Sequence, residues 1–233
     1  MLFAGVLEYT PLSCAAMFVF SSYQALTYRV DSPSLLATDF PLSGQLAFLA
    51  ELDKLKDVLR RSIVTGSRRQ ENSAEHSWHL AMMALVLMDS VAIPNLDRFH
   101  TVKMLLVHDI VEIDAGDTFC YDVAGNASKA EREIAAATRI FSLLPPNQAG
   151  EFRALWDEFE AGVTVESKFA QGLDRLQPIL QNLRTRGSSW RTHGVTKEQV
   201  LERNQKIGET MPEIWKALVH EFELAEQQGF FER

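Results

Sequence analysis

His108 and Asp109 are neighbours in the sequence, and Glu112 follows three residues after the aspartate. The apolar residues around them recur at helical spacing, so Asp109 falls within a stripe that should face the core. A buried carboxylate is unfavourable unless a partner or a cation compensates its charge. These three polar side chains therefore indicate either a network of ion pairs or a bound metal ion.

Two further polar residues lie where apolar ones are expected. His76 begins a strongly apolar segment, and Asp174 lies in the middle of a helical pattern of leucine and phenylalanine. Taken alone, His76 is more often a hydrogen-bonded histidine of the core. Asp174 can likewise be explained as an ion-pair partner of Arg175 or Lys168.

Together these side chains offer four nitrogen and oxygen ligands from three segments, namely His76, His108, Asp109 and Asp174. Neutral imidazoles combined with carboxylates suit one divalent transition-metal ion, with Co, Mn, Zn, Fe and Ni as candidates. The absence of a thiolate ligand argues against a structural zinc site. Such a set also leaves coordination positions open, as a catalytic ion requires.

Helices are expected to position these residues. The sequence predicts helices at about 73–90, 97–113 and 165–184, the first beginning at a capping box formed by Asn72 and Glu75. The first is apolar nearly all round, which predicts a buried, central helix. Similar patterns predict helices from Leu42 to about Leu59 and at about 128–143, 148–161, 197–209 and 213–228. No alternation typical of strands is found, so we predict an all-α fold, a single bundle of about seven to nine helices.

Composition narrows the class of protein. The 233 residues carry a net charge of −8, which argues against a nucleic-acid polymer as partner, although small anionic ligands remain possible. No apolar run is long enough for a membrane span. Two cysteines, Cys14 and Cys120, are too few for a disulfide framework, so a cytoplasmic location is expected.

The first part of the chain differs from the rest. Residues 1–41 contain few charges and several prolines and show no helical period. We predict an irregular N-terminal extension here and one helical domain over residues 42–233. A partner-binding or dimer arm is the alternative interpretation of this extension.

The spacing of these motifs resembles the HD-domain superfamily, which is named after its paired histidine and aspartate. The matching segments are ENSAEHSWHLA at 71–81, LVHDIVEIDAGD at 106–117 and LWDEFEAGVTVESKFAQGLDRL at 155–176. The resemblance covers roughly residues 45–225 and is strongest to the 5′-deoxynucleotidase branch. It implies that the four ligands named above bind one divalent ion.

The resemblance also implies roles for other residues. Glu112 matches the general acid/base, Arg61 an arginine that contacts the substrate phosphate, and Asp117 an acidic residue near the sugar. A solvated helix-end charge and a turn-capping carboxylate are the alternative interpretations of Arg61 and Asp117. Ser62 stands where bacterial members have a tryptophan that helps to reject ribonucleotides, which puts discrimination between deoxyribose and ribose in doubt.

The function implied is removal of the 5′-phosphate from (deoxy)nucleoside monophosphates, which gives nucleoside and phosphate. One alternative is an HD hydrolase acting on another nucleotide phosphate, such as a nucleoside triphosphate or a signalling nucleotide. Another is a non-catalytic nucleotide-binding HD module. Members of the family often form homodimers, so a homodimer is expected here.

Overall fold

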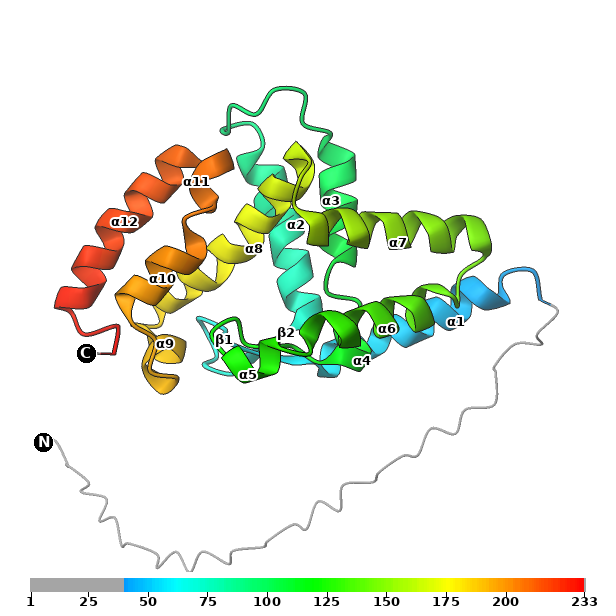
Figure 1. Ribbon diagram of the computed structural model, residues 1–233, viewed down its shortest axis with the longest axis horizontal. Helices are drawn as coiled ribbons and strands as arrows, with labels where there is room; N and C mark the ends of the chain where they lie inside the picture. The colour runs from blue at the N-terminus through cyan, green and yellow to red at the C-terminus, as the bar shows by residue number, and fades with distance from the viewer. Residues whose placement is uncertain (1–39, 233) are drawn as a thin grey trace, which may run out of the picture. The chain divides into compact units, whose positions relative to one another are not determined.

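The computed structural model describes residues 40–232 (Figure 1). All but the last two residues of the predicted N-terminal extension, 1–41, lie outside this range, and the boundary near residue 42 stays a prediction. Among the helices described, none combines the length and the hydropathy needed to cross a membrane.

Helices make up most of the described chain, and the predicted all-α fold is confirmed. Most predicted helices lie where the sequence placed them. The longer ones are α1 (Ser43–Leu52), α2 (Ser73–Leu87), α3 (Arg98–Val107), α6 (Lys129–Phe141), α7 (Pro146–Ala161), α8 (Val165–Arg184), α10 (Lys197–Asn204) and α12 (Pro212–Gln227). Shorter helical turns connect them: η1 (Asp53–Asp57), α4 (Glu112–Ala115), α5 (Val123–Asn126), α9 (Ser188–Thr192) and α11 (Ile207–Thr210).

The prediction of a helix from Leu42 to about Leu59 is wrong at the C-terminal end of that range. After α1 and the 3-10 turn η1, the chain becomes extended and forms a two-stranded antiparallel sheet from β1 (Leu59–Ile63) and β2 (Gln70–Asn72). The strands are short, and two arginines occupy β1 in place of apolar residues, so the apolar alternation that identifies a strand is missing. The hairpin matters because it directs β1 side chains toward the ends of α2 and α3.

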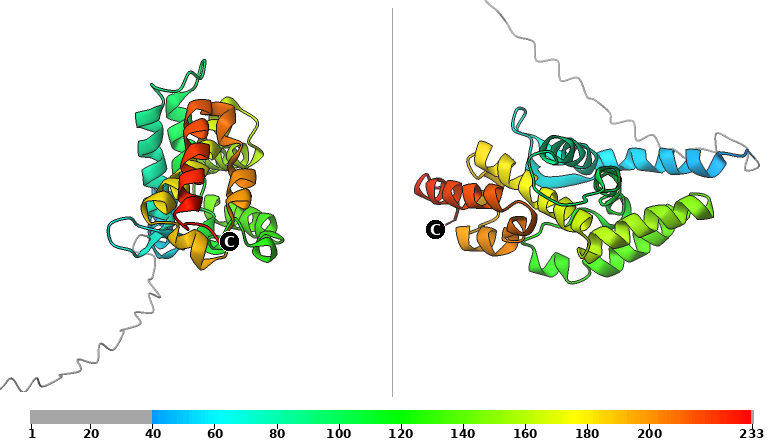
Figure 2. Two further views of the ribbon diagram at one scale, coloured as in Figure 1. Left: turned by 90° about the vertical axis from the view of Figure 1, so that its left-hand side faces the viewer. Right: turned by 90° about the horizontal axis from the view of Figure 1, so that it is seen from above.

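Helix α8 is the central element of the described residues. It contacts α2, α3, α7, α10, α11 and β1. Figure 1 and the right-hand view of Figure 2 show this helix, in yellow, passing through the middle of the bundle. Its apolar residues Phe169, Leu173 and Leu176 are almost completely buried. Phe222 of α12 and Leu105 of α3 belong to the same core. A residue of α8 that faces α2 and α3 is therefore held among the most rigidly packed parts of the fold.

The prediction that α2 is buried all round is wrong. Leu80 has no exposed surface, but Trp78, Leu85 and Val86 on the opposite side are 63%, 54% and 67% exposed. Helix α2 thus has one face in the core and one apolar face in contact with solvent.

Candidate metal centre and active site

His76 is fixed by the start of α2. The Asn72 side chain accepts a hydrogen bond from the Glu75 backbone N–H, and the Glu75 side chain accepts one from the Asn72 N–H, which is the predicted capping box. A cap of this kind stabilises a helix by about 1 kcal/mol. Because His76 follows Glu75 directly, its position is set in the first turn of the helix.

His108 and Asp109 lie where α3 ends. His108 caps the helix, and the next residues form tighter turns, with the Glu112 backbone N–H donating to the Asp109 carbonyl. The predicted helix at 97–113 is therefore interrupted after His108. Apolar Ile110 and Val111 are buried in this turn, so the packed core holds the turn in place.

The side chain of Asp174 projects from α8 toward both histidines. Its Oδ1 lies 3.0 Å from Nε2 of His76 and 4.0 Å from Nε2 of His108. Neither Arg175 nor Lys168 takes up this carboxylate: Arg175 donates to the Arg203 carbonyl, and Lys168 pairs with Glu209. The ligand atoms of His76, His108 and Asp174 all lie within 4.8 Å of one another.

Asp109 completes the cluster beside His108. Its Oδ1 lies 3.1 Å from Nε2 of His108, and its Oδ2 lies 3.8 Å from Nε2 of His76. All four side chains that were predicted as ligands therefore meet in one place, brought there by α2, the end of α3 and α8.

Both imidazoles present an unprotonated nitrogen to this cluster. Nδ1 of His108 donates to the Leu105 carbonyl, and Nδ1 of His76 donates to the Gln177 side-chain oxygen at 3.1 Å. Burial lowers the pKa of His108, and burial together with the charge of Arg60 lowers the pKa of His76 to about 3. Each ring is thus neutral, with Nε2 as an acceptor.

The surroundings of these two Nε2 atoms show whether the site suits a bound cation. Nε2 of His108 is buried and has no hydrogen-bond partner among residues 40–232. Nε2 of His76 faces a carboxylate oxygen at hydrogen-bond distance although its proton is on Nδ1. Lone pairs directed at one another are unfavourable unless a proton or a cation lies among them. The residues therefore fit a divalent metal ion held by nitrogen and oxygen.

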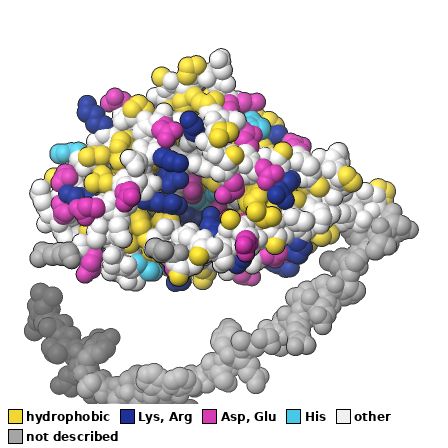
Figure 3. Space-filling model, in the orientation of Figure 1, with side chains coloured by type: hydrophobic (Ala, Val, Ile, Leu, Met, Phe, Trp, Pro, Cys, Tyr) yellow, Lys and Arg dark blue, Asp and Glu magenta, His cyan; other side chains and the backbone are white. Residues whose placement is uncertain are grey.

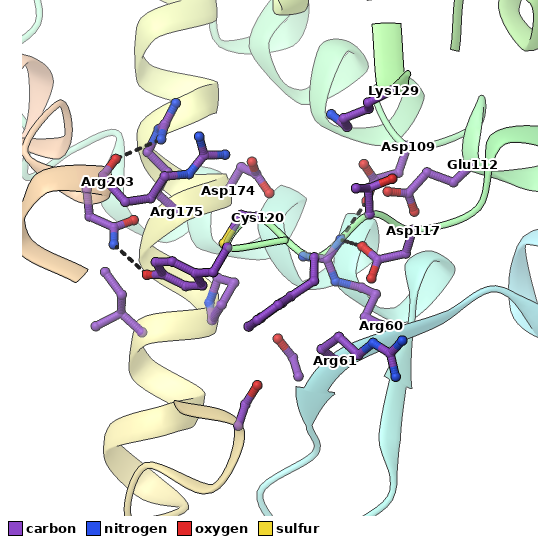
Figure 4. Close-up of a pocket in the computed structure, with 18 of the residues that line it drawn as sticks. Arg60, Arg61, Asp109, Glu112, Asp117, Cys120, Lys129, Asp174, Arg175 and Arg203 are labelled. Carbon is purple, nitrogen blue, oxygen red and sulfur yellow. Dashed lines mark hydrogen bonds and ion pairs between the residues drawn. The ribbon is translucent and has the colours of Figure 1, made fainter. Parts of the chain in front are cut away.

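An arginine that the sequence analysis did not single out lies beside the four ligands. Arg60 Nη1 donates to Asp109 Oδ2 at 3.1 Å and lies 3.7 Å from Asp117 Oδ1, while its Nε lies 3.6 Å from Glu71 Oε2. Only 12% of its side chain is exposed. Arg60 thus compensates part of the negative charge that the carboxylates concentrate here (Figure 4).

Arg61, the arginine that the resemblance implied, is the next residue of β1. It lines the same cavity as Arg60 but forms no ion pair within the described chain. Side chains alternate between the two sides of a strand. Arg60 and Ser62 consequently point inward, and Arg61 is the more exposed. Ser62 lines the cavity as a small hydroxyl side chain.

Glu112 and Asp117 lie on the other side of the ligands from α8. Ser73 Oγ donates to Glu112 Oε2 at 2.6 Å, and only 5% of Glu112 is exposed. Burial, followed by the nearby charge of Asp109, raises the pKa of Glu112 well above its usual range. Burial also raises the pKa of Asp117. Burial and the neighbouring negative charge thus favour the protonated form of Glu112, which is the direction of shift expected for a general acid/base.

Glu71 and Gln177 form a second layer that the sequence analysis did not identify. The Gln177 amide nitrogen donates to Glu71 Oε1 at 2.7 Å, which leaves its oxygen to accept from His76. Gln181 donates to the same Glu71 oxygen. The available signal was spacing, because Gln177 lies three residues after Asp174 and so shares its side of α8.

Residues 52–215 match the family model described as HD domain, which is most of the chain. The chain belongs to the HD domain family.

Relatives of known structure share the fold. The chain is similar to the predicted metal-dependent phosphohydrolase of Magnetospirillum magnetotacticum MS-1, with 44% identity, a TM-score of 0.78, and 82% of this chain and 96% of that chain covered. The HD domain-containing protein YGK1 has 17% identity and a TM-score of 0.51, with 79% of this chain and 86% of that chain covered, and shows the fold alone.

Among curated proteins, the chain is similar to the 5′-deoxynucleotidase HDDC2 of Homo sapiens, with 34% identity over 137 residues. The alignment spans 58% of this chain and 65% of the human protein. The 5′-deoxynucleotidase HDDC2 of Mus musculus is 32% identical over 63% of this chain and 72% of its own length.

Proposed function

We propose that this chain is a divalent-metal-dependent phosphohydrolase that removes the 5′-phosphate from (deoxy)nucleoside monophosphates. The observation that carries the proposal is the meeting of Asp174 with both histidines, with buried Glu112 in the same cavity. The 5′-deoxynucleotidase names of the curated relatives support the choice of substrate.

His76, His108, Asp109 and Asp174 would hold the ion, for which Co, Mn, Zn, Fe and Ni are the candidates. When bound, such an ion supplies Lewis-acid chemistry, which makes water more acidic and withdraws charge from a phosphate oxygen. The residues of the chain then bind the phosphate and move the protons.

Glu112 is proposed as the general acid/base. In its ionised form it takes a proton from the attacking water as the new P–O bond forms. It returns that proton to the 5′-oxygen as the bond from phosphorus to that oxygen breaks, so nucleoside and phosphate leave with Glu112 restored. Ser73 holds the carboxylate in position through its hydrogen bond.

Arg60 is the first candidate for contact with the substrate phosphate, because its guanidinium lies beside Asp109. A guanidinium there balances charge that develops on the phosphoryl group. Arg61, which lines the cavity from the next position, is the second candidate, and Asp117 is proposed to lie near the sugar.

The alternatives are less well supported. Hydrolysis of a nucleoside triphosphate or a signalling nucleotide would use the same ligands, and the choice between these substrates rests on the relatives. A non-catalytic nucleotide-binding module has no need for a buried glutamate with a raised pKa next to the ligands.

We further propose a homodimer in the cytoplasm. The exposed apolar side of α2, formed by Trp78, Met82, Leu85 and Val86, supports self-association because such patches are unusual on monomers. Two cysteines in the sequence are consistent with a reducing compartment. Light scattering after gel filtration measures the mass, and a monomer at micromolar concentration would reject the dimer.

Release of phosphate from a panel of nucleotides tests the main proposal. The metal-free protein is loaded with Mn or Co, and phosphate and nucleoside are quantified. We expect nucleoside 5′-monophosphates to be hydrolysed and Glu112→Ala to retain metal while losing most turnover. Hydrolysis of triphosphates alone would favour the first alternative. Nucleotide binding with no hydrolysis in any metal would favour the module.

A further inference from the structure

The cavity at the metal centre extends beyond the ligands. On the side of Asp174 away from Asp109 and Glu112, its walls include Arg175 and Arg203 (Figure 4). Figure 3 shows Lys and Arg side chains gathered beside a hollow near the middle of this face, although the chain as a whole carries a net charge of −8. Positive charge is thus concentrated in one extension of the cavity.

Arg175 and Arg203 lack the acidic partners that Arg60 and Lys129 have in the same cavity. Arg60 pairs with Asp109, and Lys129 pairs with Glu133 at 3.2 Å. In the described part of the chain, no carboxylate lies within ion-pair distance of Arg175 or Arg203, although both line the same cavity.

Arg175 is oriented by the backbone and left partly unsatisfied. Its Nη1 donates to the Arg203 carbonyl at 2.9 Å, but its buried Nε has no hydrogen-bond partner among residues 40–232. Burial and the neighbouring charge of Arg203 lower the pKa of Arg175. An arrangement that keeps two like charges together and leaves the Nε donor of Arg175 unused is stabilised when an anion binds between the two arginines.

The first phosphate of a nucleotide does not account for these arginines. In the proposed function, that phosphate lies at the ligands and is contacted by Arg60, on the opposite side of Asp174 from Arg203 (Figure 4). Arginine rather than lysine at both positions favours a planar, two-point contact with phosphate oxygens.

We propose that Arg175 and Arg203 bind a second phosphate group of the same nucleotide, one that is not hydrolysed. This inference rests on the proposed function and specifies its substrate class: nucleotides with two phosphate groups are preferred over monophosphates. The second group can be a 3′-phosphate or a further phosphate on the 5′-oxygen, which share the chemistry that the two guanidinium groups recognise.

The experiment compares deoxyadenosine 5′-monophosphate, 3′,5′-bisphosphate and 5′-diphosphate with the metal-loaded full chain. Both kcat/KM for phosphate release and the Kd from calorimetry are measured for wild type, Arg203→Gln, Arg175→Gln and Arg98→Gln. Arg203 is exposed, so its variant should fold. Arg98 is also exposed, pairs with Asp89 outside the cavity, and serves as the matched control.

We expect one of the two doubly phosphorylated nucleotides to exceed the monophosphate by about tenfold or more in kcat/KM, the size of one or two charged hydrogen bonds. Which nucleotide is preferred identifies the position of the second phosphate. The ratio of kcat/KM for the preferred nucleotide to kcat/KM for the monophosphate should fall below about threefold in Arg203→Gln and Arg175→Gln. In Arg98→Gln the ratio should stay at its wild-type value.

Two results would overturn the inference while leaving the proposed function intact. One is a wild type that hydrolyses the monophosphate at least as well as both others. The other is an equal loss for all three nucleotides in Arg203→Gln, which would place this arginine at the hydrolysed phosphate. If no nucleotide is hydrolysed, the proposed function fails. The Kd of each doubly phosphorylated nucleotide, compared with the Kd of the monophosphate in wild type and variants, then decides whether Arg175 and Arg203 bind the second phosphate.

Discussion

The side-chain oxygen of Gln177 lies 3.1 Å from Nδ1 of His76, one turn along α8 from Asp174. In the proposed metal centre, helix α8 thus contributes one ligand, Asp174, and orients the ring of a second ligand, His76. Because Nδ1 holds the proton, Nε2 of His76 is left free to bind a cation.

Gln177→Leu should therefore weaken metal binding by about 10- to 100-fold, the usual effect of removing such an orienting partner. Gln181→Leu is a matched control, since both glutamines donate to Glu71 Oε1 but only Gln177 contacts His76. Titration of the metal-free variants with Co, followed by its absorption, measures the difference. Equal affinities in the two variants would show that orientation of the ring does not matter.

Variants of Arg60 and Arg61 in β1 can be compared to find which arginine contacts the substrate phosphate. Arg60→Lys retains charge but loses the planar contact with Asp109, and we expect kcat/KM for the 5′-monophosphate to fall by about tenfold or more. Arg61→Lys should change it by less than about threefold. Lysine is preferable to alanine at position 60, because a neutral side chain would leave buried carboxylates without a counter-charge. A larger loss in the Arg61 variant would assign the phosphate contact to Arg61.

Glu112 offers a test that separates chemistry from binding. Glu112→Gln has the same size and can still accept the hydrogen bond from Ser73, so the fold and the bound ion should be retained. Turnover should fall by about 10²- to 10⁴-fold, as expected on removal of a general acid/base. Bound metal is measured by elemental analysis in the same sample. Near-normal kcat with full metal content would remove Glu112 from the mechanism.

Metal affinity should depend on pH through Asp109. In the metal-free protein, burial raises the pKa of Asp109 to about 8, although Arg60 opposes the shift. A carboxylate that binds a cation must first lose its proton, so binding releases a proton below this pH and becomes tighter as the pH rises toward 8. After treatment with a chelator, Co affinity should increase by about tenfold per pH unit between pH 6 and 7.5.

Calorimetry in buffers with different ionisation enthalpies counts the protons released by that binding. His76 contributes no opposing step in this range, because its pKa is lowered to about 3 and the ring is already neutral. An affinity that is constant between pH 6 and 8 would mean that Asp109 is ionised before the metal arrives.

Much of the fold was predictable because helices signal themselves locally. The capping box at Asn72 and the apolar periodicity of α8 identify these helices without knowledge of their neighbours. The sequence also indicated His76, His108, Asp109 and Asp174, since each is polar at a position where the core was expected. Their convergence, however, is a property of the tertiary structure.

The residues missed were those whose role depends on a short, irregular element. Arg60 points inward only because residues 59–63 form a strand, whereas a helical continuation from Leu55 to Leu59 fits the apolar spacing equally well. The exposed side of α2 was missed for a different reason. Apolar residues all round a helix predict burial. The sequence does not show, however, whether another helix packs on the side of α2 that carries Trp78 and Leu85.

The separation of the proposed ligands in the sequence determines how much of the chain must be synthesised before the metal centre can form. His76 and Asp174 are 98 residues apart, so a growing polypeptide presents both histidines well before the aspartate that completes the set. Chains that end before α8 hold an incomplete ligand set and should retain metal poorly. A retained metal ion would consequently indicate that the chain has been synthesised and folded at least as far as α8.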